Sequence, residues 1–213
     1  MPLKLNGSTS GATTLSAPAV AGNNTLTLPT GNGTADQALV TDGSGNMAWA
    51  DRGHGLTLGT SQATTSGTLI DFTGIPSWAK RITVMFNGVS TSGTNGIIVQ
   101  LGTSGGVITS GYSGYSTNFG SSNNAIVAVT TGLPLNGNSV AANNYYATCT
   151  VYNYGANQWL SNAVCPGGAT VSNGSSIAGG SITLSGTLTT VRITTVNGTD
   201  TFDAGSVNII YEG

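Results

Sequence analysis

Few side chains in this sequence have the chemistry for catalysis or metal binding. The 213 residues include one histidine, two cysteines and seven carboxylates, and only 6% of them are charged. Asp200 and Asp203 are the nearest pair of carboxylates, the arrangement that glycoside hydrolysis requires. Both stand in the turn-forming stretch 197–205, where Asn and Asp side chains bond nearby backbone amides. We therefore favour a hairpin turn over an ion site there, and an ion site over catalysis.

The remaining candidates also have simpler interpretations. His54 lies between two glycines and has no partner at the spacing of a metal motif, so we interpret it as part of a linker. Asp71 precedes a Gly-Ile-Pro sequence and is interpreted as a turn residue. Cys149 and Cys165 lie 16 residues apart in a chain without an export signal, which favours buried free thiols over a disulfide. We expect no catalytic residue, no metal, no cofactor and no enzymatic activity.

Composition narrows the class of partner. The net charge is −2 and the five basic residues are scattered, so we expect no binding to nucleic acid or to anionic lipid. No apolar run approaches the roughly 20 residues that cross a bilayer, so we expect no membrane insertion. Gly, Ser, Thr and Asn make up about half of the chain, yet 38% of it is hydrophobic. The hydrophobic fraction gives the chain enough apolar surface to form a core. The composition as a whole favours a binding or structural protein over an enzyme.

Aromatic side chains give the clearest indication of a binding surface. Tyr112, Tyr115 and Phe119, together with Asn118, lie in a Gly/Ser-rich stretch that we expect to form a loop. Rigid rings beside small polar residues are typical of adaptable binding surfaces, and Asn amides bond sugars, so these four residues are the predicted receptor-binding set. The same residues could instead cover an interface between subunits, and both interpretations stay open. For the tyrosines of 145–154, on a predicted strand, we favour sheet or interface cover.

The elements that position these residues are β-strands. Ile82, Val84 and Phe86 alternate with polar residues, which predicts one buried face. Similar patterns, separated by turn signals, predict strands at 80–89, 97–101, 107–112, 125–130, 144–154, 158–164, 181–184, 188–196 and 206–211. No helical periodicity persists over a dozen residues. We predict an all-β protein in which residues 61–213 form a β-sandwich head, jelly-roll-like in type.

The first sixty residues follow a different pattern. Short apolar pairs such as Leu3/Leu5 and Leu26/Leu28 alternate with turn-forming clusters, and 51–66 is interpreted as a junction. Each extended segment offers two or three apolar side chains, too few to close a core within one copy. We therefore predict that residues 1–60 form a short-stranded attachment and trimerisation stem, in which identical copies supply the missing walls.

Two parts of the chain resemble a known family. The stretches 3–11, 17–22, 24–29 and 33–49 at the front, and 70–86 and 191–205 further on, resemble tail-fibre and virion-fibre proteins of tailed bacteriophages, especially of the marine and cyanobacterial type. The resemblance implies a homotrimer, an N-terminal segment that docks on other tail or baseplate proteins, and a C-terminal head that touches the host surface. It implies no catalytic residues.

We therefore expect a virion structural protein, assembled in the bacterial cytoplasm. The leading hypothesis is a short trimeric tail fibre whose head binds a host cell-surface glycan. An alternative is a capsid decoration fibre, or a tail assembly component, without a receptor role. A polysaccharide-degrading tail spike is the least favoured hypothesis, because the chain has so few carboxylates.

Overall fold

The computed structural model describes residues 3–20, 22–119, 125–141, 143–166 and 175–213. The chain divides into two compact units, residues 1–53 and 54–213. This division falls inside the stretch 51–66 that we interpreted as a junction. The described residues form strands and turns and contain no helix, so the predicted all-β class is confirmed.

The first unit consists of two short hairpins. Strand β1 (Leu3–Asn6) pairs with β2 (Ala12–Leu15), and β3 (Gln37–Thr41) pairs with β4 (Met47–Asp51), both antiparallel. None of the described residues in 3–53 is buried. The described part of this unit therefore has no hydrophobic core in a single chain.

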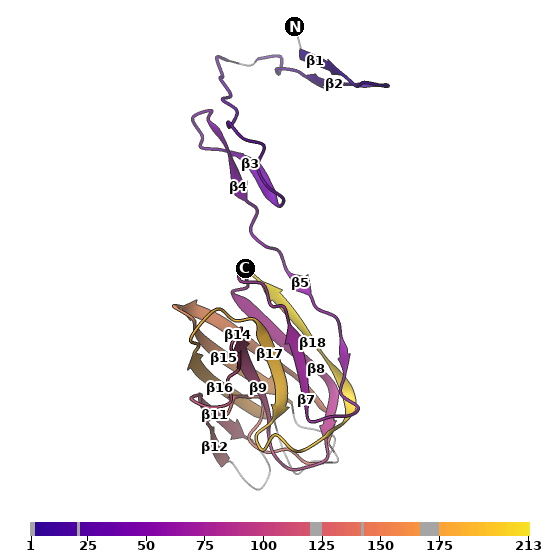
Figure 1. Ribbon diagram of the computed structural model, residues 1–213, viewed down its shortest axis with the longest axis vertical. Helices are drawn as coiled ribbons and strands as arrows, with labels where there is room; N and C mark the ends of the chain where they lie inside the picture. The colour runs from indigo at the N-terminus through magenta and orange to yellow at the C-terminus, as the bar shows by residue number, and fades with distance from the viewer. Residues whose placement is uncertain (1–2, 21, 120–124, 142, 167–174) are drawn as a thin grey trace. The chain divides into compact units, whose positions relative to one another are not determined.

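The second unit contains a smaller and a larger sheet (Figure 1). The smaller sheet has five strands, all antiparallel, in the order β10-β9-β17-β7, with β13 also on β9. Its members are β7 (Leu69–Thr73), β9 (Ile97–Thr103), β10 (Gly106–Val107), β13 (Leu133–Pro134) and β17 (Thr190–Thr195).

The larger sheet has nine strands in the order β12-β11-β16-β15-β14-β8-β18-β5, with β6 also on β18, and it curls into a half-barrel. Every pairing in it is antiparallel. Its members are β5 (Thr57–Leu58), β6 (Gln62–Ala63), β8 (Arg81–Thr91), β11 (Ser113–Asn118), β12 (Ala125–Val129), β14 (Tyr145–Gly155), β15 (Gln158–Cys165), β16 (Ser176–Thr183) and β18 (Phe202–Glu212).

One core lies between the two sheets. Ile82, Val84 and Phe86 of β8 are buried in it, as their alternation predicted, and they share it with Val99 and Ile193 of the smaller sheet. Burial of branched side chains from both sheets is the dominant stabilising contribution in such a unit.

Both cysteines belong to this core. Cys149 and Cys165 are buried and free, which confirms the predicted thiols. Burial raises the pKa of Cys149 to about 12 and that of Cys165 to about 11, because the interior disfavours the thiolate.

The expected strand 107–112 is wrong, because β10 ends at Val107 and residues 108–112 form no strand. Two other strand predictions were wrong in a related way. Residues 113–118 form strand β11 where we expected a loop, and β16 begins at Ser176 and not at Ser181. Gly114 and Gly180 face each other across these strands. A Cβ on Gly114 would lie 2.7 Å from Pro134, and one on Gly180 would lie 3.3 Å from Leu133. The glycines that suggested a loop therefore make room for β13 beneath the sheet.

Candidate ligand-contact surface

Strand β11 separates the four predicted contact residues into buried and exposed members. Tyr112, immediately before the strand, is only 3% exposed. Its Oη accepts a hydrogen bond from the Leu101 N–H at 2.7 Å and donates one to the Ile108 carbonyl at 3.0 Å. Burial raises the pKa of Tyr112 to about 12. Tyr112 therefore stabilises the second unit, which we also call the body. Its buried side chain offers no surface to a ligand, contrary to our expectation.

The other three residues reach the surface to different degrees. Tyr115 is exposed in the middle of β11, between Ala128 of β12 and Gly179 of β16. Asn118 is half-buried at the end of the strand, and Phe119 follows it with an exposed ring. The Phe119 N–H donates to the Ser175 carbonyl at 2.8 Å, which fixes the backbone beneath the ring. Asn118 and Phe119 thus follow one another at one end of the body, with the Asn118 amide near Gly137 on the inner side of β11.

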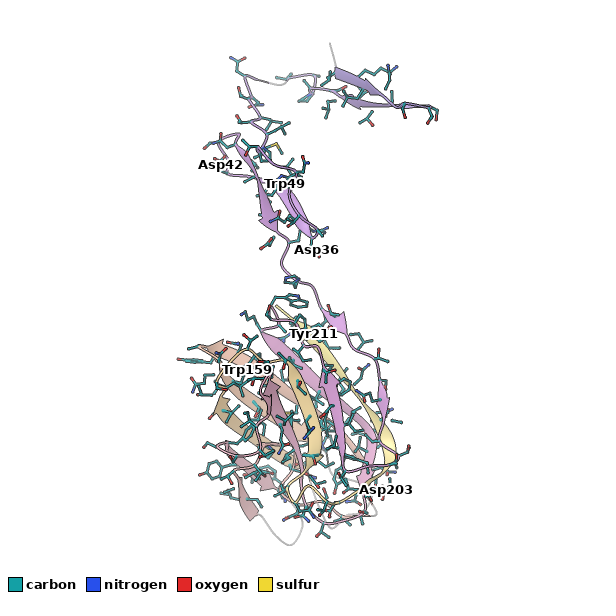
Figure 2. All side chains as sticks on the ribbon, viewed as in Figure 1. Asp36, Asp42, Trp49, Trp159, Asp203 and Tyr211 are labelled. Carbon is teal, nitrogen blue, oxygen red and sulfur yellow. The ribbon has the colours of Figure 1, made fainter. Side chains whose placement is uncertain are left out.

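That end of the body lies opposite the end at which the chain enters the second unit. The register places Arg81 beside Tyr152 and Glu212 at one end of β8, and Thr91 beside Phe202 at the other. Figure 2 shows the same polarity, with Tyr211 and Asp203 at opposite ends. The Asn118 end of β11 is paired with Ser176 and lies near Gly137, on the side of the Thr91 end.

A dense amide network stabilises the loops at this far end. Asp200 accepts hydrogen bonds from the Asn95 backbone N–H and side-chain amide, both at 3.2 Å, and from the Asn197 amide at 2.6 Å. The Asn197 hydrogen bond is the main cause that lowers the pKa of Asp200; burial opposes it, and the weaker hydrogen bonds of Asn95 add to the lowering. Asn197 Oδ1 in turn accepts from the Thr199 and Asp200 N–H groups. Asp200 is therefore a turn residue, as expected, but the turn joins β17 of the smaller sheet to β18 of the larger sheet and is not a hairpin, and Asp203 lies within β18.

The only histidine takes part in an aromatic stack that no sequence pattern predicted. The His54 ring lies parallel to Trp78 with centroids 3.9 Å apart, and Trp78 is tilted against Tyr211 at 5.6 Å. The Gly213 N–H also points at the His54 carbonyl, at 3.4 Å. His54 thus fastens the start of the second unit to its last strand.

Asp71 was also misassigned by sequence. Asp71 lies within β7. Its carboxylate accepts hydrogen bonds from Nε and Nη2 of Arg192, both at 2.7 Å, across the strand pair β7–β17. This fork geometry is the strongest form of an Arg–carboxylate contact, and it raises the pKa of Arg192. Asp71 is therefore a cross-strand ion-pair residue and not a turn residue.

Besides a cavity of about 330 Å³ lined by His54, Arg81 and Glu212 among others, the second unit has two further cavities large enough to hold a small group. One of about 470 Å³ lies between the edge of β7 and the β5–β6 segment, lined by Gln62, Asp71, Phe72 and Tyr211 among others. The other, of about 180 Å³, is lined by Lys80, Asn157 and Trp159 among others. The Trp159 indole N–H is buried and has no hydrogen-bond partner among the described residues. Neither cavity contains the carboxylate pair that sugar hydrolysis requires.

Within the described ranges, no group of three or more His, Cys, Asp and Glu side chains is placed to hold a metal ion. A membrane-spanning helix is likewise not found in the part of the chain that the structure describes.

Comparison with protein-family models, with curated proteins and with solved structures found no match to this chain.

Proposed function

We propose that this protein is a short fibre of a tailed-bacteriophage virion, which self-associates through its leading residues and contacts a host-surface glycan with its C-terminal head. In this proposal the first unit, which falls within the expected stem 1–60, trimerises and docks on tail or baseplate proteins. The second unit, which includes β5 as well as the expected head 61–213, is a jelly-roll-like sandwich. The proposal rests on the resemblance of the chain ends and on the contrast between the two units.

One observation carries the proposal. Large apolar side chains are exposed along the first unit, and none of its described residues is buried. These side chains are Leu3, Leu5, Leu15, Val20, Leu26 and Leu28. An isolated two-stranded hairpin is at best marginally stable in water, so two hairpins with an exposed apolar surface need walls from elsewhere. Other copies of the same chain would supply apolar side chains that cover this surface.

The glycan contact is assigned to the far end of the head. Phe119 offers an exposed flat ring in a stretch rich in small polar residues, a combination typical of adaptable binding surfaces. Several heads on one fibre would multiply a weak contact, because the second contact is made at high local concentration. Tyr112 is buried and is not part of this contact, and Tyr115 lies in the middle of β11 on the outward side of the larger sheet.

Adsorption of virions that carry a single substitution tests the contact. Phe119→Ala removes an exposed ring, so we expect slower adsorption to host cells with an unchanged sedimentation coefficient of the purified chain. Tyr154→Ala is the matched control, since Tyr154 is an exposed aromatic residue near the opposite end of the body. Equal adsorption of both variants would contradict the assigned contact.

Two measurements test the wider proposal. Sedimentation of the purified full chain should give a trimer, and a stable monomer would overturn it. Virions that lack this chain should adsorb poorly, whereas normal adsorption would indicate a decoration or assembly role.

A further inference from the structure

Five neighbouring strands of the larger sheet expose apolar side chains on one side. The register aligns Ile126, Thr117, Ile177, Val164 and Thr148 in one row across β12, β11, β16, β15 and β14. Ile126 is 74% exposed, Ile177 55% and Val164 50%. We call the outward side of these five strands the outer face.

Two further rows extend the outer face on the same side. One aligns Ala128, Tyr115, Gly179, Asn162 and Thr150, and the next pairs Leu160 with Tyr152. Tyr115, Leu160 and Tyr152 are exposed as well. The residues that alternate with them, such as Ala178 and Ala163, are buried in the core, which shows that the exposed set points away from it. Exposed apolar side chains gathered on one face of a sheet, here with uncharged Thr and Asn among them, mark a contact with a partner.

The outer face carries no charge. No Asp, Glu, Lys, Arg or His occurs between Arg81 and Arg192, a span that includes all five strands. A nucleic acid or an anionic lipid surface would find nothing to pair with here. Aliphatic side chains such as Ile177 and Val164 also lack the hydrogen-bonding groups that orient a sugar. The chemistry of the outer face therefore fits another apolar protein surface.

The edge and the size of the outer face agree with this conclusion. Strand β12 pairs only with β11 among the described residues, and its sequence Ala-Ile-Val-Ala-Val contains none of the Lys or Pro residues that protect edge strands. Five strands about 4.8 Å apart, with about five residues each, present a flat area of about 400 Å² before side-chain relief. A standard interface takes about 800 Å² of accessible surface from each partner, so the flat outer face alone supplies about half of one share.

We propose that the outer face packs against a second copy of this chain, so that the heads contact one another in the assembled fibre. A copy of the same chain is uncharged over the same residues, so no like charges meet. The inference rests on the proposed function in one respect, since the leading residues bring the copies together and raise their local concentration. It also assigns Tyr115 to the contact between subunits, which resolves the two interpretations that its sequence context left open.

Thiol labelling of the purified full chain tests the proposal. Ile177→Cys places a thiol on the outer face, and Leu69→Cys places one on β7 of the smaller sheet, where Leu69 is 43% exposed. The native cysteines are both buried and give little background. We expect a maleimide to react at position 177 at least about tenfold more slowly than at position 69, as for a group reached only when a contact opens. Sedimentation and circular dichroism of each variant show whether assembly and folding are retained.

The other outcomes separate this inference from the proposed function. A trimer that reacts equally fast at both positions overturns the contact between heads and leaves the fibre in place. A monomer that reacts equally fast overturns both. Fast labelling at position 177 that becomes slow on addition of dextran would show a sugar-binding surface instead, and would overturn the contact between copies.

Discussion

Buried polar side chains have hydrogen-bond partners outside their own segment of the chain. Tyr112, which bonds the backbone of Leu101 and Ile108, is the clearest example. Tyr112→Phe keeps the ring but leaves the buried Leu101 N–H without its acceptor at 2.7 Å. An unsatisfied buried donor costs about 1–3 kcal/mol, so we expect the free energy of unfolding of the full chain to fall by that amount. Urea denaturation measures it. Tyr115→Phe removes an exposed hydroxyl and should change little, and equal losses in both variants would contradict the assigned bracing role.

The buried thiols predict how stability depends on alkaline pH. In the folded chain burial holds the pKa of Cys149 at about 12 and that of Cys165 at about 11, against an ordinary value of 9.0. Between these values the unfolded chain releases protons that the folded chain keeps, so the free energy of unfolding falls as the pH rises above 9. Each group contributes about 1.4 kcal/mol per pH unit in that window.

Thermal denaturation between pH 7 and 11 measures this effect. We expect a constant melting temperature up to about pH 8.5 and a steep decline above it, in line with the titration of thiols. Cys149→Ala should make the decline shallower, because one of the contributing groups is gone. A flat profile up to pH 11 would show that both thiols are less protected than the core geometry indicates.

Among the elements, the β3–β4 hairpin depends on one glycine. Gly33 has φ = +71°, and a Cβ there would lie 2.6 Å from the Trp49 ring, whose Nε1 donates to the Gly31 carbonyl at 2.6 Å. Gly33→Ala should therefore displace Trp49. Gly43→Ala is the matched control, since Gly43 also has a positive φ but nothing within 4 Å of its Cβ position.

The Trp49 indole N–H resonance reports the change directly. We expect a shift in Gly33→Ala that indicates loss of the hydrogen bond, and the native position in Gly43→Ala. Both variants should lose about 1–2 kcal/mol from backbone strain, and only the first should lose the ring contact as well. A native resonance in both variants would contradict the close approach of Trp49 to Gly33.

Strands with alternating side chains could be predicted from the sequence, and strands built around glycine could not. Ile82, Val84 and Phe86 were assigned to a buried face because their period matches a pleated strand. Gly114 and Gly180 carry no periodic signal, and the reason for them, the approach of Pro134 and Leu133, appears only when distant strands are paired. The error for Tyr112 has the same origin, because its partners on 101 and 108 come from outside the motif.

At the scale of the whole molecule, the two units differ in what stabilises them. The second unit has its own core, and the described part of the first has none. If other copies of the chain cover the apolar surface of the first unit, the protection of its backbone amides from hydrogen exchange must rise with protein concentration, by mass action. Protection in the core strands β8 and β14 must depend on it far less.

Hydrogen exchange of the full chain at two concentrations tests this difference. On dilution we expect faster exchange in β3 and β4 and unchanged exchange in β8 and β14. Leu26→Asp should reproduce the diluted pattern at high concentration, since it places a charge in an exposed apolar segment of the first unit. Equal protection of the first unit at both concentrations would mean that the hairpins are ordered without a partner.

The long stretch without ionisable groups has a consequence for the medium in which the heads operate. Mobile ions weaken contacts between exposed charges within a Debye length, about 10 Å at 0.1 M salt. Between Arg81 and Arg192 there is no such contact to weaken. If the heads contact one another and a glycan through these strands, as proposed, screening by mobile ions should therefore not weaken those contacts as the salt concentration rises.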